Sequence, residues 1–306
     1  MKNKILITFF LISIQSILLA DNIFIESNNI TLNKDNQTSV FKDNVKIVTQ
    51  NNSIINSEFA EYNKKDGIIK LKQKVKLVDE KKNTVETELA EYDEKNKIFK
   101  TFGPTKILTE KKYLINGKDI TLNNSQKFIR SQENTTIVDQ ENNKIFLENF
   151  EYRTDNSIFK SVGYIKIEDV MKNTYEFSQI YIDTKKKEIL GTDIKAYMNQ
   201  KNFKVNDKNK PRIFSNSVKI NKDKKIFDKS IFTLCDYREN DKCPPWDIRA
   251  KKMSHDSKKK TIFYENALLK VYDIPIFFFP RLSHPDPTVD RRSGFLIPYL
   301  TNSKNL

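Results

Sequence analysis

The sequence is poor in the residues on which most enzyme active sites depend. Its 306 residues include two His and two Cys. It has no G-x-S-x-G nucleophile motif, no H-E-x-x-H zinc motif and no phosphate-binding loop. The acidic residues fall in expected turns or on outward faces, and they give no converging carboxylate pair of the kind a glycosidase needs. We therefore expect a protein that is not an enzyme and that has no cofactor.

Glycine is also scarce, with 6 residues, whereas Phe, Tyr and β-branched residues recur in short runs. This composition is typical of β-strands and gives little indication of helix. The net charge of +14 does not indicate nucleic-acid binding, because no basic run is interleaved with aromatic residues that could stack on bases. The charge fits either an ordinary lysine-rich surface or contact with an anionic membrane or lipid headgroup. Composition alone leaves these two open.

A long apolar run occurs at the N-terminus. Lys2 and Lys4 precede an apolar segment from Ile5 to Leu19, and Ala20 stands at a plausible cleavage point. The segment is short for a membrane span, which needs about 20 apolar residues. We expect residues 1–20 to be a cleaved signal peptide and the mature chain to be exported. The alternative is an uncleaved N-terminal anchor.

Apolar residues recur with a 30-residue period over most of the chain. Such a period indicates a repeat protein. Polar turn clusters separate the apolar positions, so each unit is expected to hold two strands of about ten residues joined by tight turns. Two of the series are Ile47, Leu77, Ile107, Ile137, Ile167 and Tyr197, and Ile55, Val85, Ile115, Ile145 and Tyr175.

Within the expected strands the apolar residues alternate, as in the pair Val75 and Leu77. Alternation places one face inward and one outward. Stacked units then form an elongated, folded-over sheet whose rungs touch only their neighbours and whose two ends are open strand edges. The repeat drifts after Tyr197, where a Lys- and Asn-rich insertion precedes Pro211. A last unit around 250–263 is expected to be looser.

The C-terminal segment carries specific motifs. It contains F-T-L-C at 232–235, W-D-I-R-A-K-K at 246–252, I-P-I-F-F-F-P at 274–280 and D-R-R-S-G-F-L-I-P at 290–298. These motifs resemble the junction segment of the LptD family, also called the organic solvent tolerance proteins. The 30-residue units resemble the OstA-type repeats of the same family. The resemblance covers essentially the whole mature chain.

The resemblance implies a fold and a function. The fold is all-β, an elongated β-jellyroll of stacked V-shaped strands with OstA-like repeats, ending at the start of an outer-membrane β-barrel. The expected divisions are 1–20 signal peptide, 21–272 periplasmic jellyroll and 273–306 junction with the first barrel strand. The function is lipopolysaccharide transport and assembly at the outer membrane. The expected partners are lipopolysaccharide, the membrane, a periplasmic LptA-type jellyroll and an LptE-type outer-membrane lipoprotein.

The expected sites follow from the repeat and the resemblance together. The walls of a lipid groove are expected at Ile47, Ile55, Leu77, Val85, Ile107, Ile115 and Ile137. The edge at Phe24, Ile30 and Leu32 is expected to dock the partner jellyroll by strand addition. The junction and gate are expected at Pro275, Pro280, Arg291, Arg292, Gly294 and Pro298, since a proline in a barrel strand would weaken pairing beside a lateral opening.

The two cysteines, Cys235 and Cys243, are expected to form a disulfide in an oxidising compartment. Their spacing is wider than that of typical zinc pairs. In the LptD family a cysteine matching Cys235 can instead bridge to the barrel, and Cys243 departs from the family pattern. The local pair is favoured, and the bridge stays open.

The sequence also departs from the family by stopping at Leu306, where the first barrel strand is expected to begin, so a fragment is expected. A soluble periplasmic LptA-like bridge protein is the main alternative, and the motif at 290–298 argues against it. A secreted β-solenoid with a structural or adhesive role is an alternative of another class. It would show shorter, more uniform rungs and no junction motif.

Overall fold

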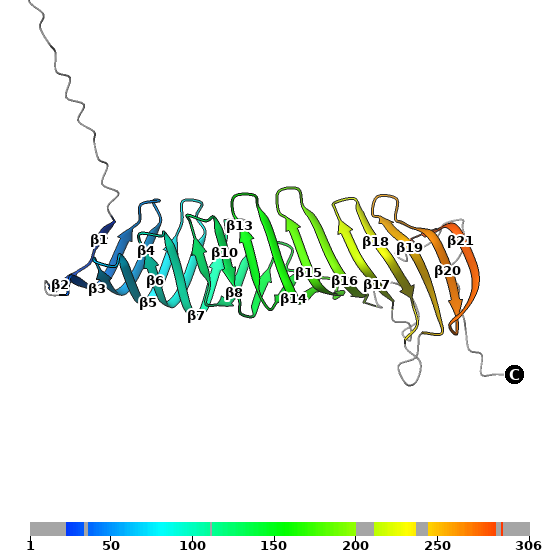
Figure 1. Cartoon of the computed structure of the whole chain (residues 1–306), viewed down its shortest axis with the longest axis horizontal. Helices are drawn as coiled ribbons and strands as arrows, with labels where there is room; N and C mark the ends of the chain where they lie inside the picture. Colours follow the sequence, from blue (N-terminus) through cyan, green and yellow to red (C-terminus); the bar gives the residue numbers. More distant parts are fainter. Residues whose placement is uncertain are drawn as a thin grey trace, which may run out of the picture.

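The structure is a computed structural model that describes residues 23–33, 36–110, 112–199, 211–236, 244–285 and 289. Over these residues the fold is all-β, without helix, and 21 strands form a single elongated sheet (Figure 1). The expected fold class is therefore confirmed. The predicted first barrel strand, at 293–306, lies outside the described residues.

Successive rungs alternate in direction along the chain, and the bounds of the strands are as follows. They are β1 (Phe24–Glu26), β2 (Asn29–Asn33), β3 (Thr38–Val48), β4 (Ile54–Asn63), β5 (Ile68–Val78), β6 (Thr84–Asp93), β7 (Ile98–Leu108), β8 (Leu114–Lys118), β9 (Thr121–Asn123), β10 (Phe128–Ser131), β11 (Thr135–Val138), β12 (Lys144–Leu147), β13 (Phe150–Arg153), β14 (Ile158–Glu168), β15 (Thr174–Asp183), β16 (Glu188–Tyr197), β17 (Arg212–Ile220), β18 (Lys224–Thr233), β19 (Trp246–Asp256), β20 (Thr261–Val271) and β21 (Ile274–Pro285).

Pairing is antiparallel between successive rungs, so the sheet grows along the chain. β1 and β2 both pair with β3, and the ladder continues to β21, which pairs with β20. The strand bounds of the first two units match the expected two ten-residue strands in each repeat. β19 and β20 have 11 residues each and pair in regular register. The expectation that this last unit is looser was therefore wrong.

A bulge in the middle of the strand pairs from β3 to β7, and again between β14 and β15, divides these strands into two arms. The register of β3 and β4 shifts between Lys42 and Val45, and that of β5 and β6 between Lys72 and Val75. The bulge residues have positive φ, as at Gly103 (83°) and Gly163 (114°). A bulge bends its strand and strengthens its twist. Because the bulges stack at equivalent positions of these repeats, this part of the sheet bends along one line.

Buried hydroxyl groups line the inside of this bend. Thr105 Oγ1 donates to the Gly103 carbonyl at 3.1 Å, and Ser57 Oγ donates to the Phe59 carbonyl at 3.1 Å. Ser161 Oγ donates to the Asn149 carbonyl at 2.6 Å. A bulge removes ladder hydrogen bonds, and buried carbonyls need other partners. Serine and threonine at the bend supply them without adding bulk.

The rungs between 114 and 153 depart from the expected ten-residue strands. Here each strand is broken at the bend into two short pieces, β8 to β13. At one break Ile120 donates its backbone N–H to Thr101 Oγ1 at 2.9 Å, so a side chain replaces part of the ladder. The rungs stay stacked because the short pieces still pair on both sides, as β11 does with β8 and β12.

The turns are joined to one another with the same period as the strands. Asn83 Oδ1 accepts the backbone N–H of Glu110 at 2.9 Å, and Asn173 Oδ1 accepts that of Asn199 at 2.8 Å. At the other end of the strands the Lys64 backbone N–H donates to the Gln37 carbonyl at 3.1 Å. Each rung is thereby fixed to the next by its turns as well as by its strands.

Candidate lipid-binding interior and sheet edges

One apolar row crosses the strands on the inner face of one arm. Register pairs connect Ile47 to Ile55, Ile55 to Leu77, and so on from strand to strand. We call this set the isoleucine row. Its members are Ile25, Ile47, Ile55, Leu77, Val85, Ile107, Ile115, Ile137, Ile145, Ile167, Tyr175, Ala196, Ile213, Phe232, Ile248, Leu269 and Phe277.

All seven candidate wall residues lie in this row. Ile115 is partly buried and the other six are buried. The repeating series found in the sequence therefore lie on alternate strands of one continuous apolar surface. The exception is Tyr197, which is 39% exposed, and Ala196 takes its place in the row. Their inward orientation agrees with a shared interior, and whether they contact lipid remains a prediction.

A second row lies on the inner face of the other arm, and we call it the tyrosine row. Tyr92 pairs in register with Ile69 and Phe99. The row comprises Tyr62, Ile69, Tyr92, Phe99, Leu122, Ile129, Tyr152, Phe159, Ile182, Ile189 and Ile220. Members of both rows share each of the two hydrophobic clusters of the molecule. The two arms therefore face each other across the bend, and their side chains fill the space between them.

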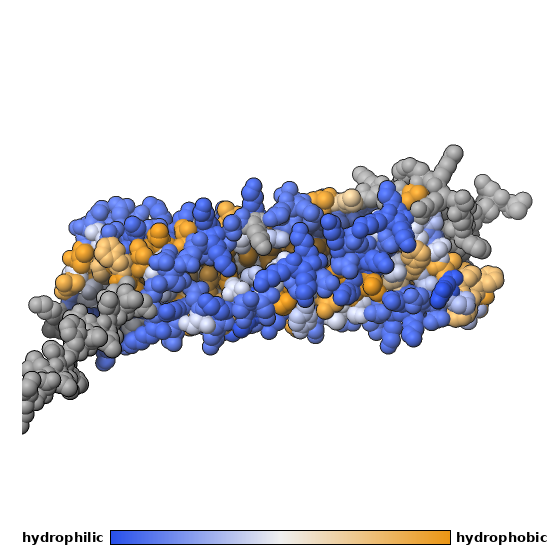
Figure 2. Space-filling view, turned by 90° about the horizontal axis from the view of Figure 1, so that it is seen from above, coloured by the Kyte–Doolittle hydropathy of each residue, from blue (hydrophilic) through white to orange (hydrophobic). Residues whose placement is uncertain are grey.

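The interior comes to the surface along one face. Figure 2 shows hydrophobic side chains along the middle of this face, between hydrophilic margins that follow the long axis. Tyr113 ends a turn on one arm, where burial and then the carboxylates of Asp139 and Glu141 raise its pKa.

The turns at the two ends of the strands carry opposite charge. The turns after β4, β6, β9, β13, β15, β17 and β19 form what we call the basic rim. Their lysines are Lys64, Lys65, Lys95, Lys97, Lys127, Lys185, Lys186, Lys187, Lys222, Lys258, Lys259 and Lys260, and their acidic residues are Asp66, Glu94, Asp155 and Asp223. The turns after β5, β7, β11, β14 and β20 form the acidic rim, where Asp79, Glu80, Glu110, Asp139, Glu141, Asp169 and Asp273 outnumber Lys81, Lys82, Lys111, Lys112 and Lys172. The turns after β16 and β18 are described only in part and are not included in this rim.

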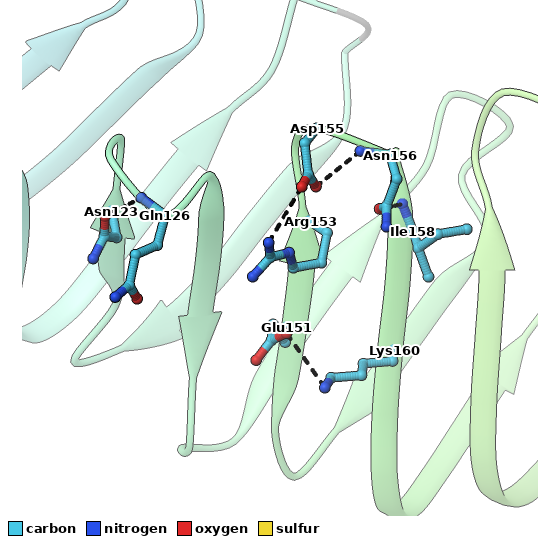
Figure 3. Close-up of polar contacts among 8 residues, drawn as sticks. All are labelled: Asn123, Gln126, Glu151, Arg153, Asp155, Asn156, Ile158 and Lys160. Atoms are coloured by element: carbon cyan, nitrogen blue, oxygen red, sulfur yellow. Dashed lines mark hydrogen bonds and ion pairs between the residues drawn. The ribbon is translucent and has the colours of Figure 1, made fainter.

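Figure 3 shows two neighbouring turns of the basic rim. Asn123 Oδ1 accepts the backbone N–H of Gln126 at 2.7 Å, which closes the first turn. In the second, Arg153 pairs with Asp155 at 3.2 Å, and this hydrogen bond lowers the pKa of the Asp155 carboxyl. These contacts hold the turn backbones. Some lysines of the same rim are also held, since Lys95 Nζ donates to the Lys65 carbonyl at 2.8 Å and Lys258 pairs with Asp223 at 3.0 Å.

The N-terminal edge exposes the residues expected to dock a partner. Phe24, Ile30 and Leu32 are 57%, 54% and 68% exposed. In the described part of the chain β1 and β2 each pair on one side only, with β3. An unpaired strand edge with apolar side chains favours strand addition. The docking itself remains a prediction.

The opposite edge is β21, which carries two of the expected junction residues. Pro275 and Pro280 are both exposed on this strand. Beside them Ile274, Ile276, Phe277 and Phe278 are exposed, although they are large and apolar. Proline suits an edge strand because it cannot donate to a further strand. The other expected gate residues, Arg291, Arg292, Gly294 and Pro298, lie outside the described residues.

The cysteine prediction is tested only in part. Cys235 is half-buried and is bonded to no other cysteine of the described chain, and Cys243 lies outside the described residues. Burial raises the pKa of the Cys235 thiol. The buried side chain of Arg212 donates to the Cys235 carbonyl and pairs with Asp236 at 3.1 Å. The expected disulfide remains a prediction.

Several features were not found from the sequence. The rim charges, the bend hydroxyls and the buried pair of Tyr264 Oη and His284 Nε2, 2.9 Å apart, need the bend and the strand register to be recognised. Across the described residues no cluster of His, Cys, Asp or Glu could hold a metal ion. In the same residues no helix is long and apolar enough to cross a membrane.

Comparison with known proteins relates the N-terminal part of the chain to lipopolysaccharide assembly. Residues 20–140 match the family described as lipopolysaccharide-assembly, LptC-related. The coarser expectation, a relation to lipopolysaccharide-transport proteins, is thereby supported for these residues. The match does not single out the LptD family. The chain matches no curated protein.

Two solved structures show weak similarity. One is LptH, the LptA-homologous periplasmic component of the lipopolysaccharide transport device of Pseudomonas aeruginosa: 10% identity, TM-score 0.17, covering 55% of this chain and 80% of that chain. The other is the TCP10 domain of CPAP from Danio rerio, in complex with a STIL peptide: 9% identity, TM-score 0.20, covering 56% and 94%.

Proposed function

We propose that the chain takes up the acyl chains of lipopolysaccharide between its two arms and passes them along the sheet, as a periplasmic bridge component of the LptA kind. The observation that carries this proposal is the isoleucine row. It presents an apolar side chain on every rung from Ile25 to Phe277 without a break. The match of residues 20–140 to lipopolysaccharide-assembly proteins supports the same function.

The energetic argument rests on shielding of lipid tails from water. Each methylene removed from water contributes about 0.8 kcal/mol, so a tail of about a dozen methylenes gains on the order of 10 kcal/mol. The interior is filled by the chain's own side chains, so a tail enters by separating the arms. Part of the gain is then offset by the contacts that are lost. The result is a carrier that holds a tail and can also release it.

The charge of the rims fits an anionic lipid headgroup. Lysines dominate the basic rim, which lies next to the tyrosine row and runs along the sheet. Its lysines attract phosphate or carboxylate groups at every turn of the rim except that at 154–157, which has none. A lipid that moves along the sheet therefore keeps its apolar contacts and meets a new cation at most rungs.

Site-specific photocrosslinking in cells tests this function. A photoreactive residue at Ile115, which faces inward on β8, is expected to capture lipopolysaccharide. The neighbouring residue Asn116 faces outward and serves as the matched control. Equal capture from both positions, or none from Ile115, would show that lipid does not travel between the arms.

We further propose that the β1–β2 edge accepts a strand from a neighbouring jellyroll of the transport path. The exposed side chains of Phe24 and Ile30 lie at this open edge. A photocrosslinker at Phe24 is expected to trap a protein partner of this type. If the crosslinker at Phe24 traps no protein while the crosslinker at Ile115 captures lipid, the docking proposal is wrong and the transport proposal stands.

A second candidate is the outer-membrane end of the same path, as in the LptD family. The apolar, proline-bearing edge strand β21 and the motif at 290–298 favour it. This candidate requires the membrane and an LptE-type lipoprotein as further partners. Fractionation separates the two: a chain recovered with outer-membrane vesicles and co-purifying with a lipoprotein supports it, whereas a chain released with the periplasm supports the soluble bridge.

A further inference from the structure

The hydroxyl of Tyr92 is buried without a hydrogen-bond partner. The Tyr92 side chain is 1% exposed, and its Oη atom has no partner in the described structure. Leaving a buried hydroxyl unpaired costs a folded protein stability, so such groups are uncommon and call for a specific explanation.

Packing of the row does not explain the hydroxyl. The equivalent positions one, two and three repeats later are Leu122, Tyr152 and Ile182, and two of these three have no polar atom in the side chain. Tyr62, one repeat earlier, is different again, because its hydroxyl donates to Glu94 Oε2 at 2.7 Å. An apolar residue therefore fits the row, and the oxygen of Tyr92 has no structural role among its neighbours.

The Tyr92 hydroxyl stays protonated at neutral pH and so is a donor. Burial, followed by the negative charges of Glu94 and Asp93, raises the pKa of Tyr92 to about 12. The side chains of its neighbours in register, Ile69 and Phe99, carry no acceptor, and the nearby Glu94 carboxylate already accepts from Tyr62 Oη at 2.7 Å. A buried water needs two to four polar partners, and the surrounding cluster is apolar. The group that would satisfy this donor is an acceptor carried on an apolar ligand.

The position of Tyr92 indicates which acceptor this is. Tyr92 is the second-last residue of β6 and lies beside the basic-rim turn at 94–97. A lipid whose headgroup is at that rim and whose tails lie between the arms places its acyl linkages at this depth. We propose that the Tyr92 hydroxyl donates a hydrogen bond to the carbonyl oxygen of an ester- or amide-linked acyl group. This inference rests on the proposed function, and it adds the chemical class of the ligand.

The test compares two synthetic phospholipids that differ only in having ester-linked or ether-linked tails, with purified lipopolysaccharide as a third probe. The proteins are the mature chain and its Tyr92→Phe variant, which keeps the ring and removes the oxygen. Tyr181→Phe, on an exposed tyrosine, is the matched control. One hydrogen bond corresponds to about a 2- to 10-fold change in affinity. We expect Tyr92→Phe to lose that factor for the ester lipid and for lipopolysaccharide, and to bind the ether lipid like the unchanged chain.

Each other outcome overturns the inference in a recognisable way. If Tyr92→Phe binds every probe as the unchanged chain does, the hydroxyl has no ligand and the transport function is untouched. If it loses ester and ether lipids equally, the effect is one of packing. If the lipid-free variant is destabilised as much as Tyr62→Phe, the hydroxyl already has a partner in the protein. If the unchanged chain binds no lipid at all, the proposed function fails together with the inference.

Discussion

The tightness of the interior can be tested at Gly191, where a single methyl group has no room. Gly191 lies in β16 between Ile180 and Val218 of the neighbouring strands. A Cβ atom there would lie 2.5 Å and 2.7 Å from Cδ1 and Cε1 of Phe177. Carbon atoms pack at about 3.5–4.0 Å, so the ring would have to move by about 1 Å. Overpacking of this kind costs about 1–3 kcal/mol.

The measurement is urea unfolding of the mature chain, followed by fluorescence. The chain has one tryptophan, Trp246, which is 3% exposed and belongs to the same cluster as Phe177. We expect Gly191→Ala to lower the free energy of unfolding by about 1–3 kcal/mol. Adding Phe177→Leu should recover part of this loss, because the smaller side chain makes room, and the double-mutant cycle isolates the clash.

A control separates the clash from backbone effects. Gly103 has a φ of 83° and no atom within 4 Å of where a Cβ would lie, so Gly103→Ala introduces strain in the backbone and no contact. Its cost should not be relieved by Phe177→Leu. An unchanged urea midpoint for Gly191→Ala would mean that the arms have spare volume at this rung. The claim that a lipid tail must displace side chains would then be refuted.

Three further predictions concern the turns, the basic rim and the tyrosines. Asn173→Ala should lower the free energy of unfolding, measured in urea, by about 1–3 kcal/mol. The reason is that Asn173 Oδ1 accepts the Asn199 N–H and the Asn173 amide donates to Asp169. The control Asn116→Ala, at an exposed position, should change it little. Replacing the lysines at 185–187 by Gln should weaken binding of lipopolysaccharide and reduce the salt dependence of that binding. The control replaces three outward-facing strand lysines by Gln and should leave binding unchanged; these are Lys70, Lys100 and Lys106. Stability should fall as pH rises from about 10 to about 12: burial raises the pKa of Tyr62 to about 12, as it does that of Tyr92, so the unfolded chain loses these protons first. In urea titrations over this pH range the free energy of unfolding of Tyr92→Phe should decline less steeply than that of the unchanged chain. An unchanged slope would contradict the role of burial.

The periodic part of the fold could be read from the sequence because the repeat is strict. Series such as Ile47, Leu77 and Ile107 predicted strands, their spacing and a shared inner face, and register pairing places them in one row. The second series, starting at Ile55, appeared separate in the sequence. The antiparallel register shows that it occupies the alternate strands of the same row.

The bend and the charged rims could not be read in the same way. A bulge is one extra residue opposite a partner strand. Asp43 and Gln73 can therefore be recognised as bulge residues only when the register is known. In the sequence the rim lysines looked like a general excess of lysine. The turns of the two rims follow each other alternately along the chain, so their charges are mixed until the strands are placed side by side. The Tyr92 hydroxyl was hidden for a further reason: tyrosine suits any strand, and only a missing partner distinguishes it.

The turn-to-turn hydrogen bonds have a consequence for the length of the molecule. The backbone N–H groups of Lys64 and Glu94 occupy equivalent places, bonded to the carbonyls of Gln37 and Gly67. Excising residues 64–93 would put Glu94 where Lys64 stands and would restore the same bond to Gln37. Both terminal strands would survive unaltered. The length of the molecule can therefore be shortened or extended in fixed steps, about 10 Å for each pair of strands, while the two end strands stay the same.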